Sequence, residues 1–411
     1  MPDEQTGLYS LILELSSDWE VSDVVVDKPQ RQVRVRVDLK ESADRCCPRC
    51  GTVGSRHDSR QRRWRHLDTC QYQTIVECWV PRVRCEEHGV LQVPVPWAES
   101  SSRFTALFEK HVIEWLHEAS LSAVARKLEL SWDQVDTIMK RAVERGLARR
   151  ERQAPRRIGI DETSFQKRHE YVTVVLDQET GVVLHVADGR DHEALDCYYR
   201  GLSAEDLAAI ECVSMDMWRA YLKSTRTHVP QAEDKICFDK FHVAKHLGDA
   251  VDKVRRRENR DLRERGDDRL TGTKYAWLQH PDNMSEERWA DFAEVRDSAL
   301  KTARAWAIKE TAMTLWGYLR RGWAEKAWKQ WLGWASRSKL KPVVAAARMI
   351  RKHLRGILNA IVHGVTNASS ESVNAKIQRV KRQACGFRNR ERFRNAIYFH
   401  CGGLDLFPEG A

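Results

Sequence analysis

The stretch RIGIDETSF, residues 157–165, has the pattern of a buried strand that contains two adjacent carboxylates. Side chains alternate between the two faces of a strand, so the two isoleucines are expected on one face and Asp161 on the other. We therefore expect Asp161 to project away from the core, in position to bind a ligand. Glu162 points to the opposite side by the same alternation, and we assign it a structural or supporting role.

A second apolar strand pattern, CVSMDMW at residues 212–218, also ends on an aspartate, Asp216. An isolated aspartate in this position is usually the N-cap of the next helix. Two strand-end aspartates in one sheet would instead be close neighbours, and such like charges are costly unless a divalent cation lies between them. Oxygen ligands favour Mg²⁺ or Mn²⁺, which bind carboxylates together with substrate phosphates.

A third carboxylate, Glu371, begins the basic helical pattern near the end of the chain. Between residues 366 and 400 there are eight Lys or Arg residues and two acids. A carboxylate at the start of such a helix can hold a metal while the basic turns contact the DNA backbone. The residues expected at backbone phosphates are Lys376, Arg379, Lys381 and Arg382. The alternative is a solvated basic helix in which Glu371 only favours the helix N-terminus.

Around these carboxylates the sequence predicts a mixed α/β sheet, because three consecutive strands are followed by alternating helices and strands. The expected strands are 158–165, 171–177, 182–188, 210–216 and 234–239, with helices at 192–209 and 218–228. Residues 240–365 are helical in pattern and contain 8 of the 15 tryptophans. Their helical spacing favours a core, and the alternative for one or two of them is stacking on unpaired bases at a distorted DNA end.

Residues 8–100 alternate apolar and polar positions, which predicts a small unit of short antiparallel strands. Within it, CPRCG and CEEHG each place two metal ligands two residues apart with a glycine after the second. Two such knuckles supply the four ligands of a structural zinc site. These ligands are Cys47, Cys50, Cys85 and His88, and Cys46 is an adjacent substitute for Cys47 that fits the spacing less well. The alternative is buried free thiols beside a surface histidine.

Two features of the N-terminal half suggest contact with DNA. Trp64 lies among Arg60, Arg62, Arg63 and Arg65, a mixture that DNA-binding surfaces use and that a solvated basic face shares. Three helical patterns follow between residues 104 and 150, and Ser131 is a good N-cap for the last of them. The short turn before Ser131 predicts a helix-turn-helix, whose second helix enters the major groove. Its expected DNA contacts are Gln134, Thr137, Lys140 and Arg141; the alternative is a three-helix spacer.

Composition agrees with a nucleic-acid partner and argues against a membrane protein. The 411 residues carry 69 Lys and Arg against 59 Asp and Glu, a net charge of +10 that suits a polyanion. No apolar run approaches the roughly 20 residues of a membrane span, and the start of the chain lacks a basic segment typical of a secretory signal. The 11 cysteines are odd in number, and most are scattered, which favours a reducing compartment. We expect a cytoplasmic protein, associated with the nucleoid when bound to DNA.

Taken in order, these motifs resemble the bacterial insertion-sequence transposases of the ISL-three family. The resemblance covers nearly the whole chain, and its most specific blocks are residues 234–246 and 366–401. It implies an RNase H-like core with a DDE triad at Asp161, Asp216 and Glu371. The segment CFDKFH, residues 237–242, is similar to a D-x-x-H element of several DDE groups, which makes Asp239 and His242 second-rank candidates. His88 departs from the commonest pattern, which has cysteine there, but histidine also binds zinc.

The resemblance divides the chain into five expected parts. We expect a β-rich zinc-binding module at residues 1–100 and a helix-turn-helix domain at residues 101–152. The first part of an RNase H-like core is expected at residues 153–242, a helical insertion at residues 243–365, and the C-terminal core helices carrying Glu371 at residues 366–411.

The expected activity is DNA transposition. The N-terminal domains would bind the terminal inverted repeats of the element, and two Mg²⁺ (or Mn²⁺) ions at the triad would support cleavage and then strand transfer into target DNA. Work on paired ends implies a homodimer or higher oligomer on DNA. Two alternatives stay open at this point: a DNA-binding regulator on an inactive RNase H-like scaffold, and an RNase H-like nuclease of repair or RNA metabolism.

Overall fold

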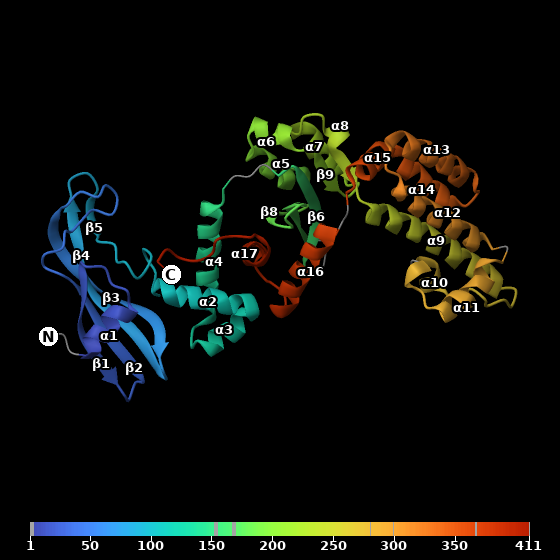
Figure 1. The fold of residues 1–411 in the computed structure, drawn as a ribbon. Helices are drawn as coiled ribbons and strands as arrows, with labels where there is room; N and C mark the ends of the chain where they lie inside the picture. Colours follow the sequence, from blue (N-terminus) through green and yellow to red (C-terminus); the bar gives the residue numbers. More distant parts are fainter. Residues whose placement is uncertain are drawn as a thin grey trace. The chain divides into compact units, whose positions relative to one another are not determined.

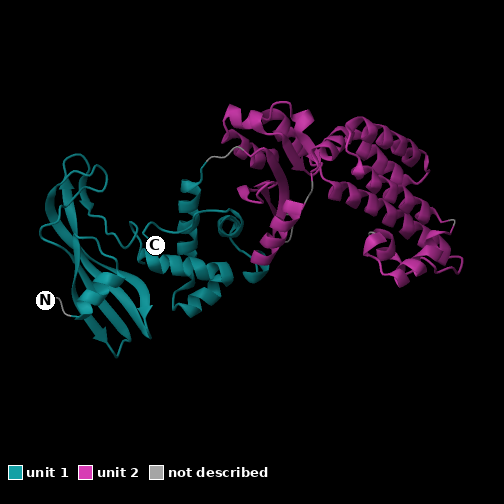
Figure 2. Cartoon of the chain, viewed as in Figure 1, with its two compact units in different colours: residues 1–151, 381–411 teal, residues 152–380 magenta. Residues whose placement is uncertain are grey.

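The computed structural model describes residues 4–151, 155–166, 170–279, 281–298, 300–365 and 368–410. It divides into two compact units, unit 1 with residues 1–151 and 381–411, and unit 2 with residues 152–380 (Figure 2). The expected boundaries at residues 153 and 366 lie outside the described residues. The expected last part, 366–411, is divided between the two units, because its final helix packs in unit 1.

Unit 1 begins with a helix and a five-stranded sheet of order β1-β2-β4-β3, with β5 added beside β4 (Figure 1). Its elements are α1 (Glu4–Ile12), β1 (Trp19–Asp27), β2 (Gln32–Leu39), β3 (Ser55–Thr69), β4 (Tyr72–Cys85) and β5 (Gly89–Gln92). Val35, Trp64 and Val76 are fully buried on its inner face.

Two expectations for this sheet need correction. The prediction of short antiparallel strands is wrong for β3 and β4, which have 15 and 14 residues, and for β2, which pairs with β4 in parallel. The sequence pattern could not predict this parallel pairing, because alternation within one strand carries no information about the strand it pairs with. The alternating pattern was also extended too far toward the N-terminus, because residues 8–12 belong to α1.

The three predicted helices are present as α2 (Ala106–Glu118), α3 (Leu121–Lys127) and α4 (Trp132–Arg149). Ser131 caps α4, and the Gln134 side chain returns a hydrogen bond to the backbone of Ser131, which completes a capping box. A fourth helix, α17 (Arg390–Cys401), packs against α4, and Phe399 and Leu406 join the core of the first three helices. The C-terminal segment is therefore part of the helix-turn-helix domain.

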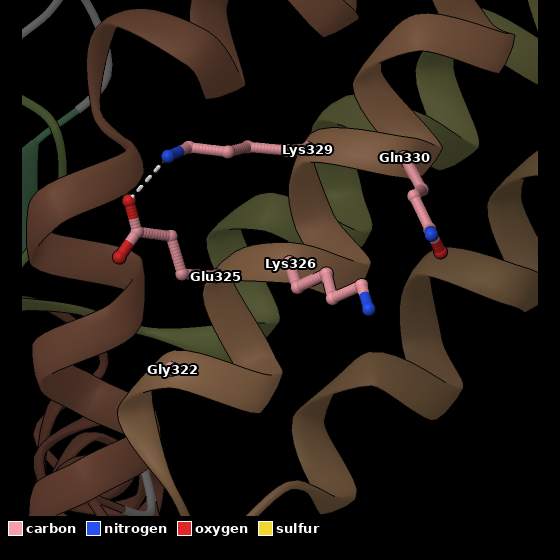
Figure 3. Close-up of a pocket in the computed structure, with 5 residues that line it drawn as sticks. All are labelled: Gly322, Glu325, Lys326, Lys329 and Gln330. Carbon is pink, nitrogen blue, oxygen red and sulfur yellow. Dashed lines mark ion pairs between the residues drawn. The ribbon is translucent and has the colours of Figure 1, made fainter.

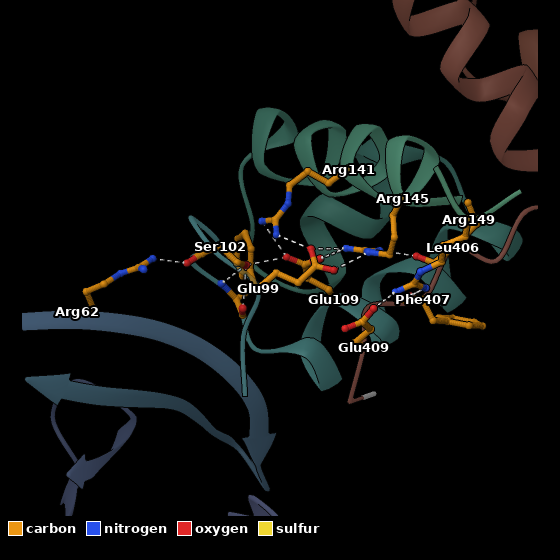
Figure 4. A network of polar contacts seen from close by, with 11 residues as sticks. Arg62, Glu99, Ser102, Glu109, Arg141, Arg145, Arg149, Leu406, Phe407 and Glu409 are labelled. Atoms are coloured by element: carbon orange, nitrogen blue, oxygen red, sulfur yellow. Dashed lines mark hydrogen bonds and ion pairs between the residues drawn. The ribbon is translucent and has the colours of Figure 1, made fainter. Parts of the chain in front are cut away.

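A network of buried ion pairs fastens the parts of unit 1 together (Figure 4). Glu109 on α2 is 1% exposed, accepts a hydrogen bond from the Ser102 hydroxyl at 2.7 Å, and faces the guanidinium groups of Arg141 and Arg145, each at 3.1 Å. The same two arginines also contact Glu99, at 2.8 and 2.6 Å. Arg145 further donates to the backbone carbonyl of Leu406, so the network joins α2, α4 and the C-terminal tail.

Unit 2 contains the predicted mixed sheet, of order β10-β9-β6-β7-β8. The strands are β6 (Arg157–Gln166), β7 (Glu170–Asp177), β8 (Val183–Asp188), β9 (Cys212–Met215) and β10 (Ile236–Phe238). β6, β7 and β8 form an antiparallel meander, whereas β9 runs parallel to β6 and β10 parallel to β9. The helices between them are α5 (His192–Arg200), α6 (Ala204–Ala209), α7 (Arg219–His228) and α8 (Ala232–Lys235).

The predicted helical block follows β10 and shares a core with the sheet. It contains α9 (Lys240–Arg263), α10 (Lys274–Leu278), η1 (Pro281–Asn283), α11 (Glu286–Arg296), α12 (Lys301–Thr314), η2 (Leu315–Gly317), α13 (Arg321–Arg337), α14 (Lys341–Lys352) and α15 (Leu354–His363). α15 packs against β10 at Gly356, where a Cβ would lie 2.5 Å from the Phe238 ring, so only glycine fits.

Six of the eight tryptophans in this block contribute to its core, as expected. They are Trp277, Trp289, Trp306, Trp316, Trp328 and Trp331. The expectation is wrong for Trp323 and Trp334, which are 60% and 40% exposed. On a helix of 3.6 residues per turn, their positions fall outside the face formed by Trp328 and Trp331.

No helix in the described ranges combines the length and apolar composition needed to cross a membrane. All eleven cysteines lie in the described ranges, and none of them forms a disulfide.

We predict that Arg145→Ala lowers the free energy of unfolding of unit 1 by roughly 3–5 kcal/mol, because it leaves Glu109 buried with an incomplete set of partners. Urea denaturation followed by circular dichroism measures this loss. Arg34→Ala is the control, since the Arg34–Asp27 pair is partly exposed and contributes little. Equal effects of the two substitutions would contradict the prediction.

Candidate functional site

Three parallel strands of unit 2 bring aspartates level with one another. The expected strand end at Asp161 is wrong, because β6 continues to Gln166 beside β7, whereas Asp216 and Asp239 directly follow β9 and β10. β6 and β9 pair Gly159 with Ser214, so two residues further on Asp161 is level with Asp216. β9 and β10 pair Met215 with Phe238, so one residue further on Asp216 is level with Asp239. Neighbouring strands lie about 4.8 Å apart. The strand register therefore places the three carboxylates in a row along one edge of the sheet.

Helix α16 (Ala368–Gln383) lies along the face of β6 that carries Asp161. A Cβ on Gly159 would lie 3.2 Å from the Ser370 hydroxyl, the Asn374 amide donates to Asp161 Oδ2 at 2.6 Å, and the Gln378 amide donates to Thr163 at 3.0 Å. Four helical residues rise about 6.0 Å and two strand residues about 6.6 Å, so helix and strand stay in step over these three contacts.

The same helix brings Glu371 toward the aspartates. Glu371 is exposed on the first turn of α16, and its charge acts on Asp239. His242, on the first turn of α9, has its Nδ1 3.6 Å from Asp216 Oδ1. Asp239 caps α9 by accepting a hydrogen bond from the Phe241 amide at 2.9 Å. The structure thus brings together all five predicted residues, which we call the acidic site: Asp161, Asp216, Asp239, His242 and Glu371.

The acidic site favours positive charge. Burial raises the pKa of Asp161 above its ordinary value, and the neighbouring Asp216 carboxylate adds to this effect. Hydrogen bonds from the Glu162 amide and the Asn374 side chain, and the His242 ring, act in the opposite direction. Burial likewise raises the pKa of Asp239, with Glu371 and Asp161 contributing. A cation bound among these groups would relieve the repulsion that raises both pKa values.

The donor set fits a hard divalent cation, because the carboxylates offer only oxygen. In the described part of the chain, three or more possible ligand atoms lie within 4.8 Å of one another at two places, the cysteine cluster and the group His192, Glu193 and Asp196. The acidic site is therefore more open than either. Mg²⁺ usually takes one or two carboxylates and completes its shell with water and phosphate oxygens, which suits an open site.

Glu162 lies beside the acidic site but contacts a different partner. Its carboxylate is 3.5 Å from Arg190, whose guanidinium stacks on Tyr171 and Trp218 at 4.6 and 4.7 Å from the ring centroids. Burial raises the pKa of Glu162, and Arg190 opposes the shift. The supporting role assigned to Glu162 agrees with this contact and stays a prediction.

The four predicted zinc ligands form a compact cluster in unit 1. The Cys50 and Cys85 sulfurs are 3.6 Å apart, and His88 Nδ1 lies 3.6 Å from Cys85 and 3.9 Å from Cys47. A tetrahedral site with metal–sulfur bonds of about 2.3 Å separates its ligand atoms by roughly 3.8 Å, so the cluster fits zinc without rearrangement.

The loop around the first two cysteines is also shaped for a metal. Gly51 and Gly89, directly after the second ligand of each knuckle, have φ of +74° and +71°, which explains the glycines. Hydrogen bonds from Thr52 lower the pKa of Cys50 to about 6, which favours the thiolate that binds zinc. Cys46 lies outside the cluster and pairs through its backbone with Val53.

Several side chains predicted to contact DNA are engaged within unit 1. Gln134 caps α4, Thr137 donates to the Asp133 carbonyl at 2.7 Å, and Lys140 pairs with Glu391 at 2.7 Å. Arg141 belongs to the ion-pair network, and its side chain is only 20% exposed. In this arrangement Arg141 supports the fold, and Lys140 would have to leave Glu391 to reach DNA.

The arginines around Trp64, on the hairpin of β3 and β4, are likewise partly engaged within unit 1. Arg62 stacks on Trp64 and donates to the Ser102 carbonyl at 2.8 Å, and Arg65 pairs with Asp68 and is 10% exposed at its side chain. Arg63 pairs with Glu77 at 3.0 Å but keeps 62% of its side chain exposed, so it remains the most accessible of the three. On α16, Lys376, Arg379 and Arg382 are exposed, and Lys381 is half-buried.

Sequence reasoning missed Asn374, which donates a hydrogen bond to Asp161. The available signal was a polar stripe at Ser370, Asn374 and Gln378, spaced by four residues in a helix already expected beside the carboxylates. Sequence reasoning also missed Arg190, whose stacking partners come from separate elements.

Comparisons with known proteins give one consistent result. Residues 158–397 match the model of the ISL3 DDE domain, described as a transposase. Residues 93–143 match a helix-turn-helix domain of transposase family ISL3, and residues 44–88 match a zinc-finger of the transposases of IS204, IS1001, IS1096 and IS1165.

Two curated relatives resemble the chain along most of its length. The transposase for insertion sequence element IS1557 of Mycobacterium tuberculosis is 32% identical, over 87% of this chain and 86% of the relative. The transposase for insertion sequence element IS1001 of Bordetella parapertussis is 28% identical, over 85% of this chain and 86% of the relative.

We predict that the purified protein contains one zinc ion and that Cys85→Ser loses it, because three ligands do not close a tetrahedral site. Metal analysis and hydrogen exchange of β4 and β5 measure the loss of zinc and of local order. Cys46→Ser is the matched control and should retain zinc. Loss of zinc from Cys46→Ser with retention in Cys85→Ser would overturn the ligand assignment.

Proposed function

The chain belongs to the ISL3 family of DDE transposases, and on that premise we propose that it binds the terminal inverted repeats of its own insertion sequence and catalyses metal-dependent cleavage and strand transfer at the element ends. The observation that supports this most is the row of level aspartates, Asp161, Asp216 and Asp239, with α16 placing Glu371 beside it. The order β10-β9-β6-β7-β8, with its antiparallel meander and two parallel strands, supports an RNase H-like core.

We propose that Asp161, Asp216 and Glu371 hold Mg²⁺ or Mn²⁺. Bound there, the cation supplies a Lewis acid that activates water or a 3′-hydroxyl and stabilises the leaving oxygen. Asp161 is oriented for this role, because Oδ1 accepts from the Glu162 amide at 2.7 Å and Oδ2 from Asn374 at 2.6 Å. Each oxygen keeps a second lone pair for a metal.

His242 and Asp239 have supporting roles in this proposal. With its Nδ1 near Asp216 Oδ1, His242 orients that carboxylate. Asp239 is buried and occupied as the cap of α9, so it fixes the helix that carries His242. Both are therefore positioning residues, while the triad contacts the metal.

DNA is held from both units in this proposal. The helix-turn-helix and the zinc-finger, both matched to domains of transposases, would recognise the element ends. On α16, exposed Lys376 and Arg379 follow Glu371 by one to two turns, so they can contact backbone phosphates close to the reacting bond. Strand transfer by a 3′-hydroxyl needs no covalent enzyme intermediate, and joining two ends requires at least a dimer on DNA.

We predict that the protein nicks duplex DNA containing an element end in Mg²⁺ or Mn²⁺ and that Asp161→Asn abolishes nicking while end binding remains. Glu162→Gln is the matched control, an adjacent carboxylate that contacts Arg190 instead, and should keep most activity. Gel assays of nicking and of mobility shift measure the two properties. Cleavage without preference for element ends would favour a general nuclease, and binding without cleavage under either metal would favour an inactive regulator.

We predict that Asn374→Ala lowers nicking about tenfold to a hundredfold at neutral pH, since a hydrogen bond to a charged group is worth roughly 1.5–3 kcal/mol. The lost bond normally lowers the pKa of Asp161, so its removal raises that pKa and leaves less of the ionised form that binds metal. The acidic limb of the pH–rate profile should therefore move to higher pH, and the defect should shrink as pH rises.

Gln378→Ala is the control for Asn374→Ala, because Gln378 lies one turn further along the same face of α16 and bonds to Thr163 instead of a carboxylate. It should leave the pH profile in place. An unshifted profile in Asn374→Ala would contradict a role through Asp161.

A further inference from the structure

The positive charge of the chain is concentrated in one part of the helical block. Residues 311–370 contain eleven Lys or Arg and a single acid, Glu325, an excess equal to the net charge of +10 of the whole chain. Residues 1–310, which include the zinc-finger and the helix-turn-helix, contain 50 basic and 54 acidic residues. The segment around α13 and α14 is therefore, with the basic helix α16, one of the two parts of the chain that attract a polyanion most strongly.

Exposed tryptophans occur within this basic segment. The buried face of α13 is formed by Ala324, Trp328, Trp331, Leu332 and Ala335. Trp323 and Trp334 lie outside that face and are 60% and 40% exposed. Eleven residues make just over three full turns, so the two rings emerge on the same side of the helix, about 16 Å apart along its axis. Two exposed rings on one side of a basic helix offer flat apolar faces to a ligand.

Polar and cationic side chains lie between and beside the two rings. Lys326 and Gln330 fall between them on the helix surface, Arg337 follows Trp334, and the Lys326 ammonium is 5.9 Å from the centroid of the Trp323 ring. We call Trp323, Lys326, Gln330, Trp334 and Arg337 the α13 strip. The only acid nearby in sequence, Glu325, is neutralised by Lys329 at 2.6 Å.

The surface beside the strip is hollowed. An open pocket of about 550 Å³ is lined by Gly322, Glu325, Lys326, Lys329 and Gln330. Figure 3 shows Lys326 and Gln330 projecting from one side of α13, while Lys329 reaches back to Glu325 on the other. Gly322 contributes no side chain, so the surface next to Trp323 is open to a flat group.

The start of α13 is tied to the strand that leads to the acidic site. Arg321 donates to the Asn359 side-chain oxygen at 2.7 Å, and the Asn359 amide donates to the Ile236 carbonyl at 2.8 Å. Ile236 begins β10, whose end is followed directly by Asp239. Two hydrogen bonds therefore hold the Trp323 end of the strip in a fixed relation to the edge where the aspartates lie.

We propose that the α13 strip binds unpaired nucleotides of the DNA that is held at the acidic site. Bases stack on Trp323 and Trp334, and Lys326 and Arg337 contact the phosphates between them. In an intact duplex each base face is already covered by its neighbours, so a tryptophan ring can stack only on DNA that is single-stranded or distorted. The large excess of positive charge in this segment favours a polyanion over a protein partner. The inference rests on the proposed transposase activity.

The test compares binding of a fluorescent oligothymidylate and of a blunt duplex by the full-length protein, using fluorescence anisotropy. Trp323→Ala should weaken oligothymidylate binding roughly tenfold, the scale of one lost base stack, and leave duplex binding nearly unchanged. Trp323→Phe, which keeps an aromatic face, should recover most of the loss. Tyr275→Ala is the matched control, because Tyr275 is 69% exposed with Lys274 over its ring but lies on α10, outside the strip.

Unchanged oligothymidylate binding in Trp323→Ala, or equal loss for oligothymidylate and duplex, would overturn the stacking proposal. The same proteins are assayed for nicking of end-containing DNA. If the wild type nicks DNA and Trp323→Ala binds oligothymidylate normally, only the α13 strip proposal fails. If the wild type does not nick under either metal while Trp323→Ala shows the selective loss, the proposed function fails and the binding surface remains.

Discussion

The contact between α16 and β6 is the interaction on which the acidic site depends. Asp161 can be held partly buried beside two other carboxylates only because Asn374 and a backbone amide each donate to one of its oxygens. Gly159 makes the contact possible, because any side chain there would press on Leu176 and Ser370. The matched rise of helix and strand then extends the contact to Thr163 and fixes the turn that carries Glu371. The glycine of the RIGIDETSF stretch, Gly159, is therefore explained by packing, as Asp161 is explained by the acidic site.

Local sequence patterns predicted many of the helices, strands and site residues of this molecule. They did not predict how segments far apart in the sequence pair with one another. The strands of unit 2, Asp216 at the end of its strand and the Cys47, Cys50, Cys85 and His88 set follow from alternation and spacing within short windows, whereas Asp161 lies within β6 and not at its end. The level arrangement of Asp161, Asp216 and Asp239 depends on the register of β9 and β10, which no single window contains. The same limit explains the unexpected parallel pairing of β2 with β4 and the packing of α17 on α4.

The C-terminal segment of the chain belongs to both units. Residues up to Val380 of α16 belong to unit 2, and the residues after it belong to unit 1. The helix that carries Glu371 therefore continues into the segment whose last helix pairs Glu391 with Lys140 and Arg392 with Asp136 on α4. The helix expected to read DNA, α4, is therefore packed against the last helix of the same C-terminal segment.

The N-terminal part of the chain and the helical block differ in net charge. Residues 1–310 are slightly acidic by count, although they contain both predicted recognition domains, whereas residues 311–370 carry the excess of the whole chain. Recognition of a defined sequence depends on the geometry of base contacts and needs no large net charge. Holding DNA of any sequence against a carboxylate site requires unpaired cations, because the phosphates and the carboxylates repel each other. A basic helical block joined to β10 through Asn359 supplies that attraction beside the acids and leaves the acidic site itself free for metal.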